Sequence, residues 1–298
     1  MTRPLSMKTA SVVTLRSEPP ALAEPLARPV PLARARGRLD LGFKRRGAET
    51  VLDVLFQEGC AKARFPRREE GAFTGAVLLN TAGGLTGGDR LSQAVRWGDG
   101  TAATVAGQAA ERIYRSLGDA ARIETRLSVE PGAVAEWLPQ ETILFDRARL
   151  YRDLQIELRG DARFLGVEAI VFGRAAMGEV VRQGTLRDAW RIRRDGRLVY
   201  ADALAVEGDP AAVLDRPGLG RGARAVATLL FAAPEAQVLI DPLRAALAGT
   251  EGLAGASAWN GLLVARFAAP DGAVLRRNLI SALGVLRAGR PLPRVWQC

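Results

Sequence analysis

The sequence has no histidine among its 298 residues. This absence excludes serine–histidine–aspartate and cysteine–histidine catalysis within the chain, and it excludes the zincin motif. A metal bound here must take carboxylates, backbone carbonyls, water or thiols as its ligands. Such a site holds a borderline metal more weakly than an imidazole site does, so the composition suits metal transfer better than metal storage.

Cysteine is also scarce, with only Cys60 and Cys298 in the chain. No C-x-x-C pair occurs, so neither a zinc knuckle nor a redox motif is present. We expect Cys60 to be a small buried residue, as free cysteines commonly are. Cys298, the last residue, is the other thiol available to a metal.

Long apolar runs are missing as well. No stretch of about 18 apolar residues predicts a transmembrane helix, and the N-terminal residues lack the unbroken apolar centre of a signal peptide. We therefore expect a cytoplasmic protein without a membrane partner. Prolines between positions 19 and 31 predict an extended, disordered leader over residues 1–36, followed by a single domain over residues 37–298.

Negative charge is in deficit, and the formal net charge is +10. Only three of the 42 basic residues are lysine, so arginine supplies the other 39. A positive field favours acidic partners, and nucleic acid is one such partner. No aromatic RNA-binding motif or recognition-helix pattern accompanies the densest basic cluster, at residues 34–46. A solvated or protein-facing basic surface is the favoured interpretation, with a basic β-rich nucleic-acid-binding protein as the alternative.

From Gly37 onward apolar and polar residues mostly alternate, which predicts strands. Turn sequences separate these strands at Asp99-Gly100, Pro131-Gly132, Gly160-Asp161 and Asp195-Gly196, and the last of these predicts a hairpin. Many short strands of this kind indicate a mainly β protein with a multi-strand body.

Helical signals are few. Residues 109–117 predict a short helical turn. Asp241 and Pro242 predict a helix start with Asp241 as N-cap. The clearest helix is expected near the C-terminus, where Leu275, Leu279, Leu283 and Leu286 share one face. Asp271 is expected to cap this helix, and its apolar face is expected either to pack on the β body or to meet a partner helix.

The stretch "LLNTAGGLTGGDRL", residues 78–91, holds four glycines within six positions. A phosphate-binding loop needs lysine and serine or threonine after the last glycine, whereas Asp89 and Arg90 follow Gly88 here. A dinucleotide fingerprint needs a helix after the glycines, whereas the next residues alternate as a strand. We expect these glycines to serve tight turns and close backbone approach, not a nucleotide.

The same stretch resembles the glycine-rich signature of the urease accessory protein UreD family, whose members are called UreH in some species. Four further segments agree with that family in order, and the similarity runs from about Gly37 to the C-terminus. They are "AERIYRS" (110–116), "WLPQETILFDRARL" (137–150), "FGRAAMGE" (172–179) and "LRRNLISALGVLR" (275–287). One departure is "NTA" at residues 80–82, where many members carry a histidine and prolines.

The resemblance implies a β-helical body with a few helices near the C-terminus. It also implies a non-enzymatic chaperone that assembles with UreF and the GTPase UreG, docks on apo-urease and helps deliver nickel to its active site. UreF would bridge the chain to UreG, and an internal passage would conduct the nickel. No tightly bound cofactor is expected, only transient Ni²⁺.

Four carboxylates are candidates for the nickel path: Glu179, Glu141, Asp146 and Asp89. Glu179 ranks first because it matches a motif glutamate that the family comparison connects with nickel transfer. Each carboxylate also has a structural interpretation. Arg174 is the obvious counter-ion for Glu179, and Asp146 is placed to pair with a neighbouring arginine on the surface.

The other two carboxylates have equally plain alternatives. Glu141 is expected to be buried beside an arginine or to face a water-filled passage, and Asp89 to cap a turn through its own backbone. A third class of function, a hydrolase built on Glu141 and Asp146, depends on a side-chain separation that sequence does not give.

Overall fold

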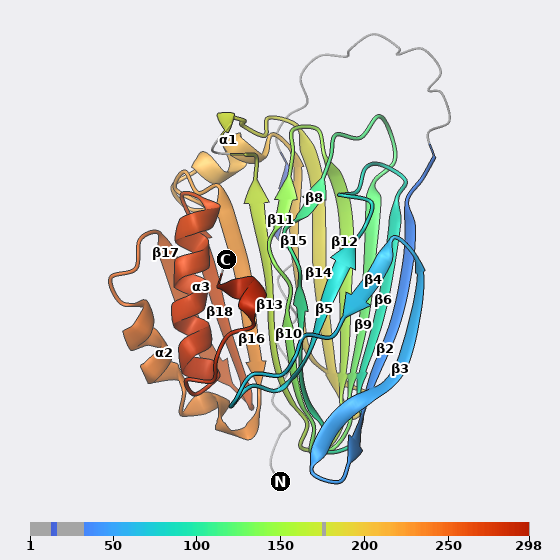
Figure 1. The fold of residues 1–298 in the computed structure, drawn as a ribbon. Coiled ribbons are helices and arrows are strands. Elements are labelled where there is room, and N and C mark those ends of the chain that lie inside the picture. The colour runs from blue at the N-terminus through green and yellow to red at the C-terminus, as the bar shows by residue number, and fades with distance from the viewer. Residues whose placement is uncertain (1–12, 17–32, 175–176, 298) are drawn as a thin grey trace, which may run out of the picture.

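The alternating pattern of the sequence forms strands that divide between two facing β-sheets. The computed structural model describes residues 13–16, 33–174 and 177–297. The first sheet has eight strands in the order β1-β15-β14-β12-β9-β6-β2-β3, and the second follows the path β17-β18-β16-β13-β10-β7-β5-β4, with β8 and β11 attached beside it (Figure 1). The prediction of a mainly β, multi-strand body is confirmed.

The strands of the first sheet have the following bounds: β1 Val13–Arg16, β2 Arg36–Arg46, β3 Glu49–Gly59, β6 Arg90–Trp97, β9 Ala121–Val129, β12 Arg149–Leu158, β14 Gly184–Arg194 and β15 Arg197–Gly208. Those of the second sheet are β4 Ala61–Arg64, β5 Thr74–Asn80, β7 Ala102–Gly107, β8 Glu111–Ile113, β10 Val134–Leu138, β11 Thr142–Leu144, β13 Arg163–Phe172, β16 Ala225–Ala232, β17 Leu253–Trp259 and β18 Leu262–Ala269. The helices are α1 Pro210–Asp215, α2 Ile240–Leu247 and α3 Gly272–Leu286, with 3-10 turns η2 Pro234–Gln237 and η3 Arg294–Trp296.

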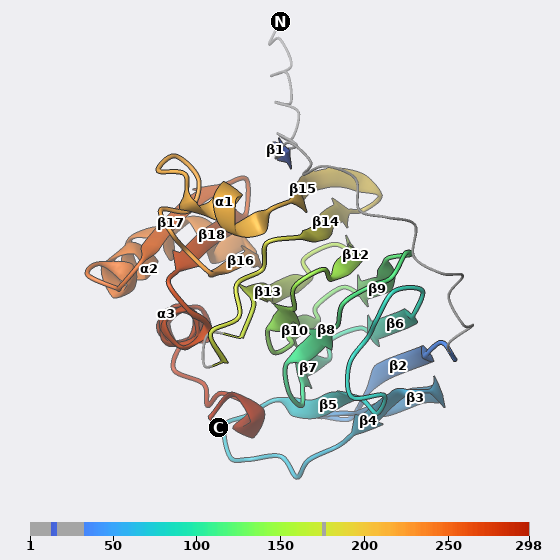
Figure 2. The same ribbon diagram turned by 90° about the horizontal axis from the view of Figure 1, so that it is seen from above.

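The chain coils between the sheets. β6, β9 and β12 pair in parallel in the first sheet, and the strand that follows each of them, β7, β10 and β13, pairs in parallel in the second (Figure 2). Each coil therefore adds one strand to each sheet, which is the expected β-helical arrangement. Three of the four predicted turns connect the two sheets, and only Asp195-Gly196 closes a hairpin, between β14 and β15.

The three connecting turns stack on one another at one end of the body. The Gly100 amide donates to the Pro131 carbonyl at 2.9 Å, and the Gly132 amide donates to Asp161 Oδ1 at 2.7 Å. The glycines have φ values of +63° and +69°, a left-handed conformation that glycine adopts without steric cost. The turns thus set the pitch of the coil.

The space between the sheets holds the larger apolar core. Side chains at alternate positions point inward, as on β9, where Ile123, Thr125, Leu127 and Val129 are buried and Arg122, Glu124 and Arg126 are exposed. Cys60 is also buried, as predicted.

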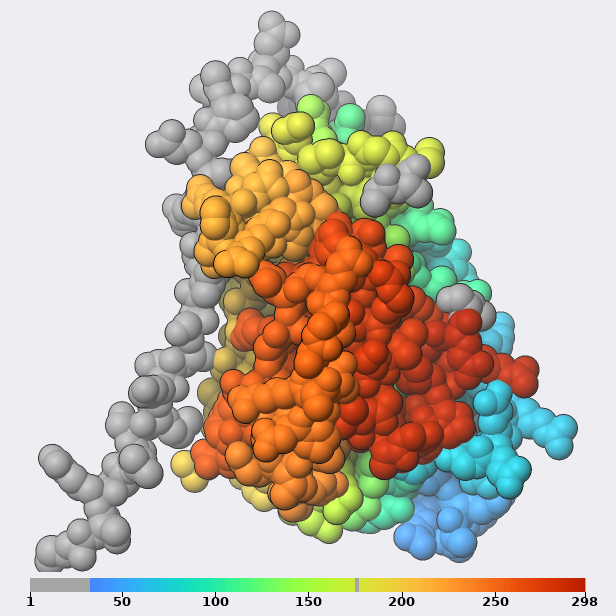
Figure 3. Space-filling view, turned by 90° about the vertical axis from the view of Figure 1, so that its left-hand side faces the viewer, coloured from blue at the N-terminus to red at the C-terminus, as the bar shows by residue number. Residues whose placement is uncertain are grey.

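Helices cover the outer face of the second sheet (Figures 2 and 3). Leu275, Leu279 and Leu283 of α3 join a second apolar cluster with outward-facing residues of β13, β16 and β18. Asp271 Oδ1 accepts a hydrogen bond from the Val274 amide at 2.8 Å, which confirms the predicted cap. The apolar face of α3 therefore packs on the β body.

Two local predictions were wrong. Residues 111–113 form β8, because the bridge to β11 outweighs the weak helical signal there. α2 begins at Ile240 with Leu239 as the N-cap, so Asp241 lies within its first turn and does not cap it.

The predicted disordered leader lies mostly outside the described residues. The segment Val13–Arg16 forms β1, which pairs in parallel with residues 204–207 of β15 at the edge of the first sheet.

The glycine-rich stretch is a turn between β5 and β6, and β6 follows it directly. A Cβ atom on Gly87 would lie 2.0 Å from Ser116 Oγ and 2.3 Å from the Asp119 carbonyl oxygen. Close backbone approach therefore requires glycine there, as predicted.

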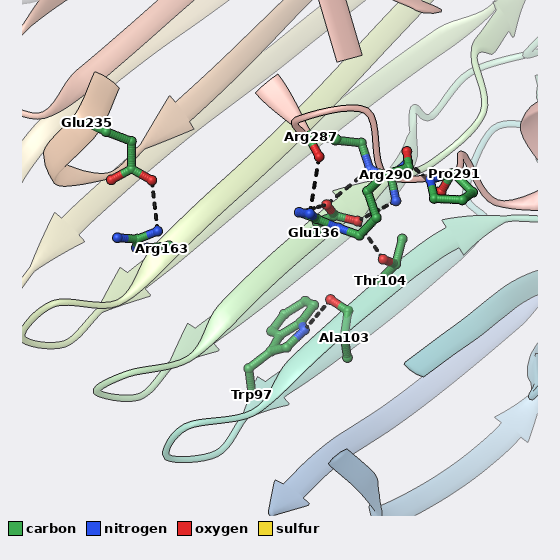
Figure 4. Close-up of polar contacts among 9 residues, drawn as sticks. All are labelled: Trp97, Ala103, Thr104, Glu136, Arg163, Glu235, Arg287, Arg290 and Pro291. Atoms are coloured by element: carbon green, nitrogen blue, oxygen red, sulfur yellow. Dashed lines mark hydrogen bonds and ion pairs between the residues drawn. The ribbon is translucent and has the colours of Figure 1, made fainter. Parts of the chain in front are cut away.

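The C-terminal end of α3 is tied to the second sheet through Glu136 of β10 (Figure 4). Arg287 Nε lies 3.0 Å from Glu136 Oε1, and Thr104 Oγ1 donates to Glu136 Oε2 at 2.5 Å. Arg290 adds a longer contact at 3.4 Å and stacks over the Phe73 ring. Glu136 and Arg287 are each 1% exposed, so each buried charge needs the opposite charge of the other side chain.

We predict that Arg287→Met destabilises the fold by about 3–5 kcal/mol, because it leaves the buried Glu136 carboxylate with only the longer contact to Arg290. The free energy of unfolding in urea measures this. Arg277→Met is the matched control on the same helix, since the Arg277–Glu251 pair is exposed, and it should change stability by about 0.5 kcal/mol or less. Adding Glu136→Gln to Arg287→Met should recover part of the loss. Equal effects of the two arginine variants would contradict the assignment.

Candidate functional site

A row of polar side chains crosses the otherwise apolar space between the sheets. We call it the interior polar row. Its members are Gln93 (β6), Thr125 (β9), Arg152 (β12), Asp188 (β14) and Asp202 (β15) on the first sheet, and Trp137 (β10), Glu168 (β13), Thr228 (β16) and Arg266 (β18) on the second. The register of the strands aligns them: Gln93 pairs with Thr125, Arg152 with Asp188, and Glu168 with Thr228.

A buried ion-pair cluster forms the middle of this row. Arg152 Nε and Nη2 donate to the two oxygens of Asp188 at 2.8 and 2.7 Å, and Nη1 lies 2.5 Å from Glu168 Oε2 across the core. Thr142 Oγ1 accepts a further bond from Arg152, and Trp137 Nε1 donates to Glu168 at 2.9 Å. The three charged side chains are only 5–8% exposed.

Two carboxylates thus share one guanidinium in this cluster. Burial raises the pKa of Glu168, and the Asp188 charge adds to that effect, although Arg152 opposes it. Burial lowers the pKa of Arg152, but Asp188 and Glu168 more than offset this, so Arg152 stays charged. The cluster is therefore a fixed positive charge held between two acids.

Two cavities flank the cluster, and Glu168 lines both. The Glu111 cavity, about 230 Å³, is lined by Glu111, Asn80, Thr125 and Arg152 among others. The Asp202 cavity, about 700 Å³, has a lining that includes Asp188, Trp190, Asp202, Thr228 and Arg266. Every member of the interior polar row lines one of the two cavities, so the row marks a polar course through the body.

Glu111 of β8 is the carboxylate that lines the first cavity and not the second. Its Oε1 accepts a hydrogen bond from Asn80 Nδ2 at 2.9 Å. Burial raises its pKa to about 7, even though Asn80 and the Arg112 amide favour the ionised form. Glu111 can therefore gain or lose a proton near neutral pH.

The Asp202 cavity is polar at its outer end. Arg266 Nη2 lies 2.5 Å from Asp202 Oδ2, and Tyr200 Oη lies 3.2 Å from the same oxygen. Trp190 is 2% exposed, and its Nε1 donates no hydrogen bond to any described residue. An indole N–H in such a position is available to a polar species in the cavity.

The structure brings two of the four predicted carboxylates together. Glu179 Oε1 accepts a hydrogen bond from the Asp146 amide at 3.3 Å, and Glu179 Oε2 pairs with Arg174 at 2.8 Å. The suggested counter-ion for Glu179 is thus present. Asp146 Oδ1 accepts the amides of Arg182 and Gln183, so it also organises the loop.

The other two predicted carboxylates lie elsewhere. Asp89 is 4% exposed and accepts the amides of Ala35 and Thr86 at 2.8 Å, which is the turn-capping arrangement. Glu141 is partly exposed, 3.8 Å from Arg276. None of the four predicted carboxylates lines the Glu111 cavity or the Asp202 cavity.

Sequence reasoning missed the interior residues, although part of the signal was present. Glu168 interrupts the apolar run "RFLGVEAIVF", and Arg152 has the same parity as Leu150 and Leu154 in an alternating strand. A charge at a core position of a strand indicates a buried partner. Which strand supplies that partner depends on how the sheets face each other.

We predict that Glu111→Gln stabilises the chain at pH 8 but not at pH 4. The folded state holds the Glu111 proton up to about pH 7 and the unfolded state only to its ordinary pKa of 4.5. The associated stability is therefore complete below pH 4.5 and is lost as pH rises through 7, a difference on the order of 3 kcal/mol. Thermal unfolding at both pH values tests this. Glu251→Gln, at an exposed site, should change neither value, and a pH-independent effect of Glu111→Gln would contradict the assignment.

Comparison with known proteins places the sequence in a family. The model of the UreD urease accessory protein family matches residues 35–297. A urease accessory protein UreD from Methylobacterium sp. (strain 4-46) is 51% identical over 89% of this chain and 95% of its own length. Relatives with the same name from Rhizobium rhizogenes and Xanthobacter autotrophicus are 47% and 46% identical, over 88% and 97% of this chain and 95% and 99% of their own lengths. The chain belongs to the UreD family of urease accessory proteins.

Proposed function

We propose that this chain is a non-catalytic scaffold of urease maturation that conducts nickel. It binds apo-urease and UreF, and UreF joins it to the GTPase UreG. Nickel passes through the space between the two sheets on its way to the urease active site. Membership of the UreD family supports the role in urease maturation; the partners and the nickel course are the proposal.

The observation that carries the proposal is the interior polar row with its two cavities. An apolar core of this size normally interdigitates without voids larger than a water molecule. Here two cavities meet at Glu168, and carboxylates follow one another from Glu111 through Glu168 and Asp188 to Asp202. A succession of oxygen donors can pass a divalent cation from one to the next.

The ligand set supports transfer over storage. Among residues 33–174 and 177–297, no group of three or more histidine, cysteine, aspartate or glutamate side chains gathers in a way that could hold a metal ion. With no histidine in the sequence, nickel meets oxygen ligands that hold it loosely. Ni²⁺ is thus cargo and not a resident cofactor.

The partners follow from the same proposal. No helix in the described part of the chain is both long and apolar enough to cross a bilayer. The net charge of +10 favours association with acidic protein surfaces. We place the assembly in the cytoplasm, where apo-urease would be made.

The decisive test is urease activation in cells that carry the urease operon with the gene for this chain deleted and then restored. We expect deletion to abolish activity while apo-urease protein stays at its normal level, and restoration to recover activity. UreF should co-purify with the restored chain. Full activity without the gene would refute the role in maturation.

We predict that Glu179→Ala lowers urease activation several-fold when nickel is limiting, while UreF still co-purifies. Glu179 and Asp146 lie outside the two cavities, so the prediction tests whether nickel also uses this pair of carboxylates, one of which the substitution removes. Arg174→Met is the matched control, because it breaks the Arg174–Glu179 pair but keeps the carboxylate. If Arg174→Met has the same effect as Glu179→Ala, the role of Glu179 is structural and Glu179 is not a nickel ligand.

A further inference from the structure

The Arg152 cluster forms the wall between the two cavities. Arg152 and Glu168 line the Glu111 cavity, and Glu168 and Asp188 line the Asp202 cavity. Any cation that moves from one cavity to the other must pass these two carboxylates.

We infer that the Arg152 guanidinium is a resident cation that occupies the place between Glu168 and Asp188 where a divalent metal ion would otherwise be retained. Arg152 thus keeps the midpoint of the proposed nickel path from becoming a site that stores nickel. This inference rests on the proposed conduction of nickel. It names the residue that keeps nickel binding weak along the path.

The geometry supports this role in three ways. Arg152 binds Asp188 through two parallel hydrogen bonds of 2.8 and 2.7 Å, which fixes the plane of the guanidinium. The third nitrogen reaches Glu168 on the opposite sheet at 2.5 Å. Two acids from different sheets therefore converge on one small volume, as ligands converge on a metal ion.

The choice of arginine matters for the same reason. A guanidinium stays protonated at any physiological pH, and the two carboxylates raise the pKa of Arg152 further. A lysine buried here would lose its proton more readily, and the carboxylates would then be free to bind metal. With Arg152 in place, an arriving cation meets two carboxylates that already share one positive charge.

The surroundings are able to accommodate a hydrated ion on both sides. Thr142 and Thr228 supply hydroxyl oxygens in the cavity linings, and the Trp190 indole has no acceptor among the described residues. Polar groups of this kind exchange hydrogen bonds with water as readily as with protein. A hydrated cation can therefore reach the cluster from either cavity. For the cation to move on, the two carboxylates of the cluster must not bind it tightly.

The test is nickel binding by the purified full chain carrying Arg152→Met, measured by equilibrium dialysis with NiCl₂ and by thermal unfolding with and without NiCl₂. Removing the guanidinium leaves two buried carboxylates without a counter-ion. We expect Arg152→Met to bind about one Ni²⁺ per chain at least about tenfold more tightly than the unaltered chain. Ni²⁺ should raise its unfolding temperature, whereas an equal concentration of Mg²⁺ should do so less.

Two control variants locate the new site. Arg152→Met combined with Glu168→Gln and Asp188→Asn should lose the added nickel. Arg266→Met, which frees the single carboxylate of Asp202, should gain none. The inference is overturned if folded Arg152→Met binds no more nickel than the unaltered chain, or if the triple variant binds as much as Arg152→Met. Should Arg152→Met be unfolded without metal, NiCl₂ must restore the fold, and failure to do so also overturns the inference.

Urease activation separates this inference from the proposed function. Under limiting nickel, Arg152→Met should activate urease poorly and excess nickel should restore activation, because trapped ions no longer matter. If the chain is needed for activation but Arg152→Met gains no nickel, the inference fails and the scaffold function stands. If Arg152→Met gains nickel but deletion of the gene leaves urease activation unchanged, the proposed role in urease maturation is refuted. The conclusion that Arg152 blocks a metal site is then kept.

Discussion

The need to match buried charge between the two sheets constrains the whole body. Arg152 stands on the first sheet, and one of its two acids, Glu168, stands on the second. An unmatched charge at this depth costs several kcal/mol, so β12, β13 and β14 must keep one alignment. Apolar contacts alone tolerate sliding and repacking more easily. The two cavities lie on either side of this ion-pair cluster. Its side chains extend toward their charged partners and so leave the space beside them unfilled.

Strand content was predictable from the sequence because alternation has a direct physical cause. A half-buried strand must present apolar side chains at every second position, and that pattern is legible in segments such as β9 and β12. The capped α3 was equally legible, since Asp271 and the leucine spacing act locally. The sheet to which each strand belongs could not be predicted from the sequence. Pro131-Gly132 and Gly160-Asp161 look like hairpin turns, yet they carry the chain from one sheet to the other, and only packing decides this.

The candidate site shows the same limit more sharply. Motif resemblance selected Glu179, Glu141, Asp146 and Asp89, which lie in loops or at strand ends. Asp89 and Asp146 accept backbone amides there, and Glu179 and Glu141 each lie beside an arginine side chain. The interior polar row comes from strands that are distant in the chain, and no spacing links Glu168 to Arg152 and Asp188. A charge at a core position is visible in sequence, but its partner is not. Asn80 illustrates this point, because it stands in the segment that departs from the family pattern and proves to contact Glu111.

The order of the elements along the chain has a consequence for how the protein is made. The outward residues of β13, such as Val167 and Ala169, are buried by α2 and α3, and the Glu136–Arg287 pair completes that cover. β13 leaves the ribosome well before α3 does, because synthesis runs from the N-terminus. The outer apolar face of the second sheet therefore stays uncovered until α2 and α3 have been made. More than 100 residues separate the start of β13 at Arg163 from the start of α3 at Gly272, so this face depends on a segment that is made much later.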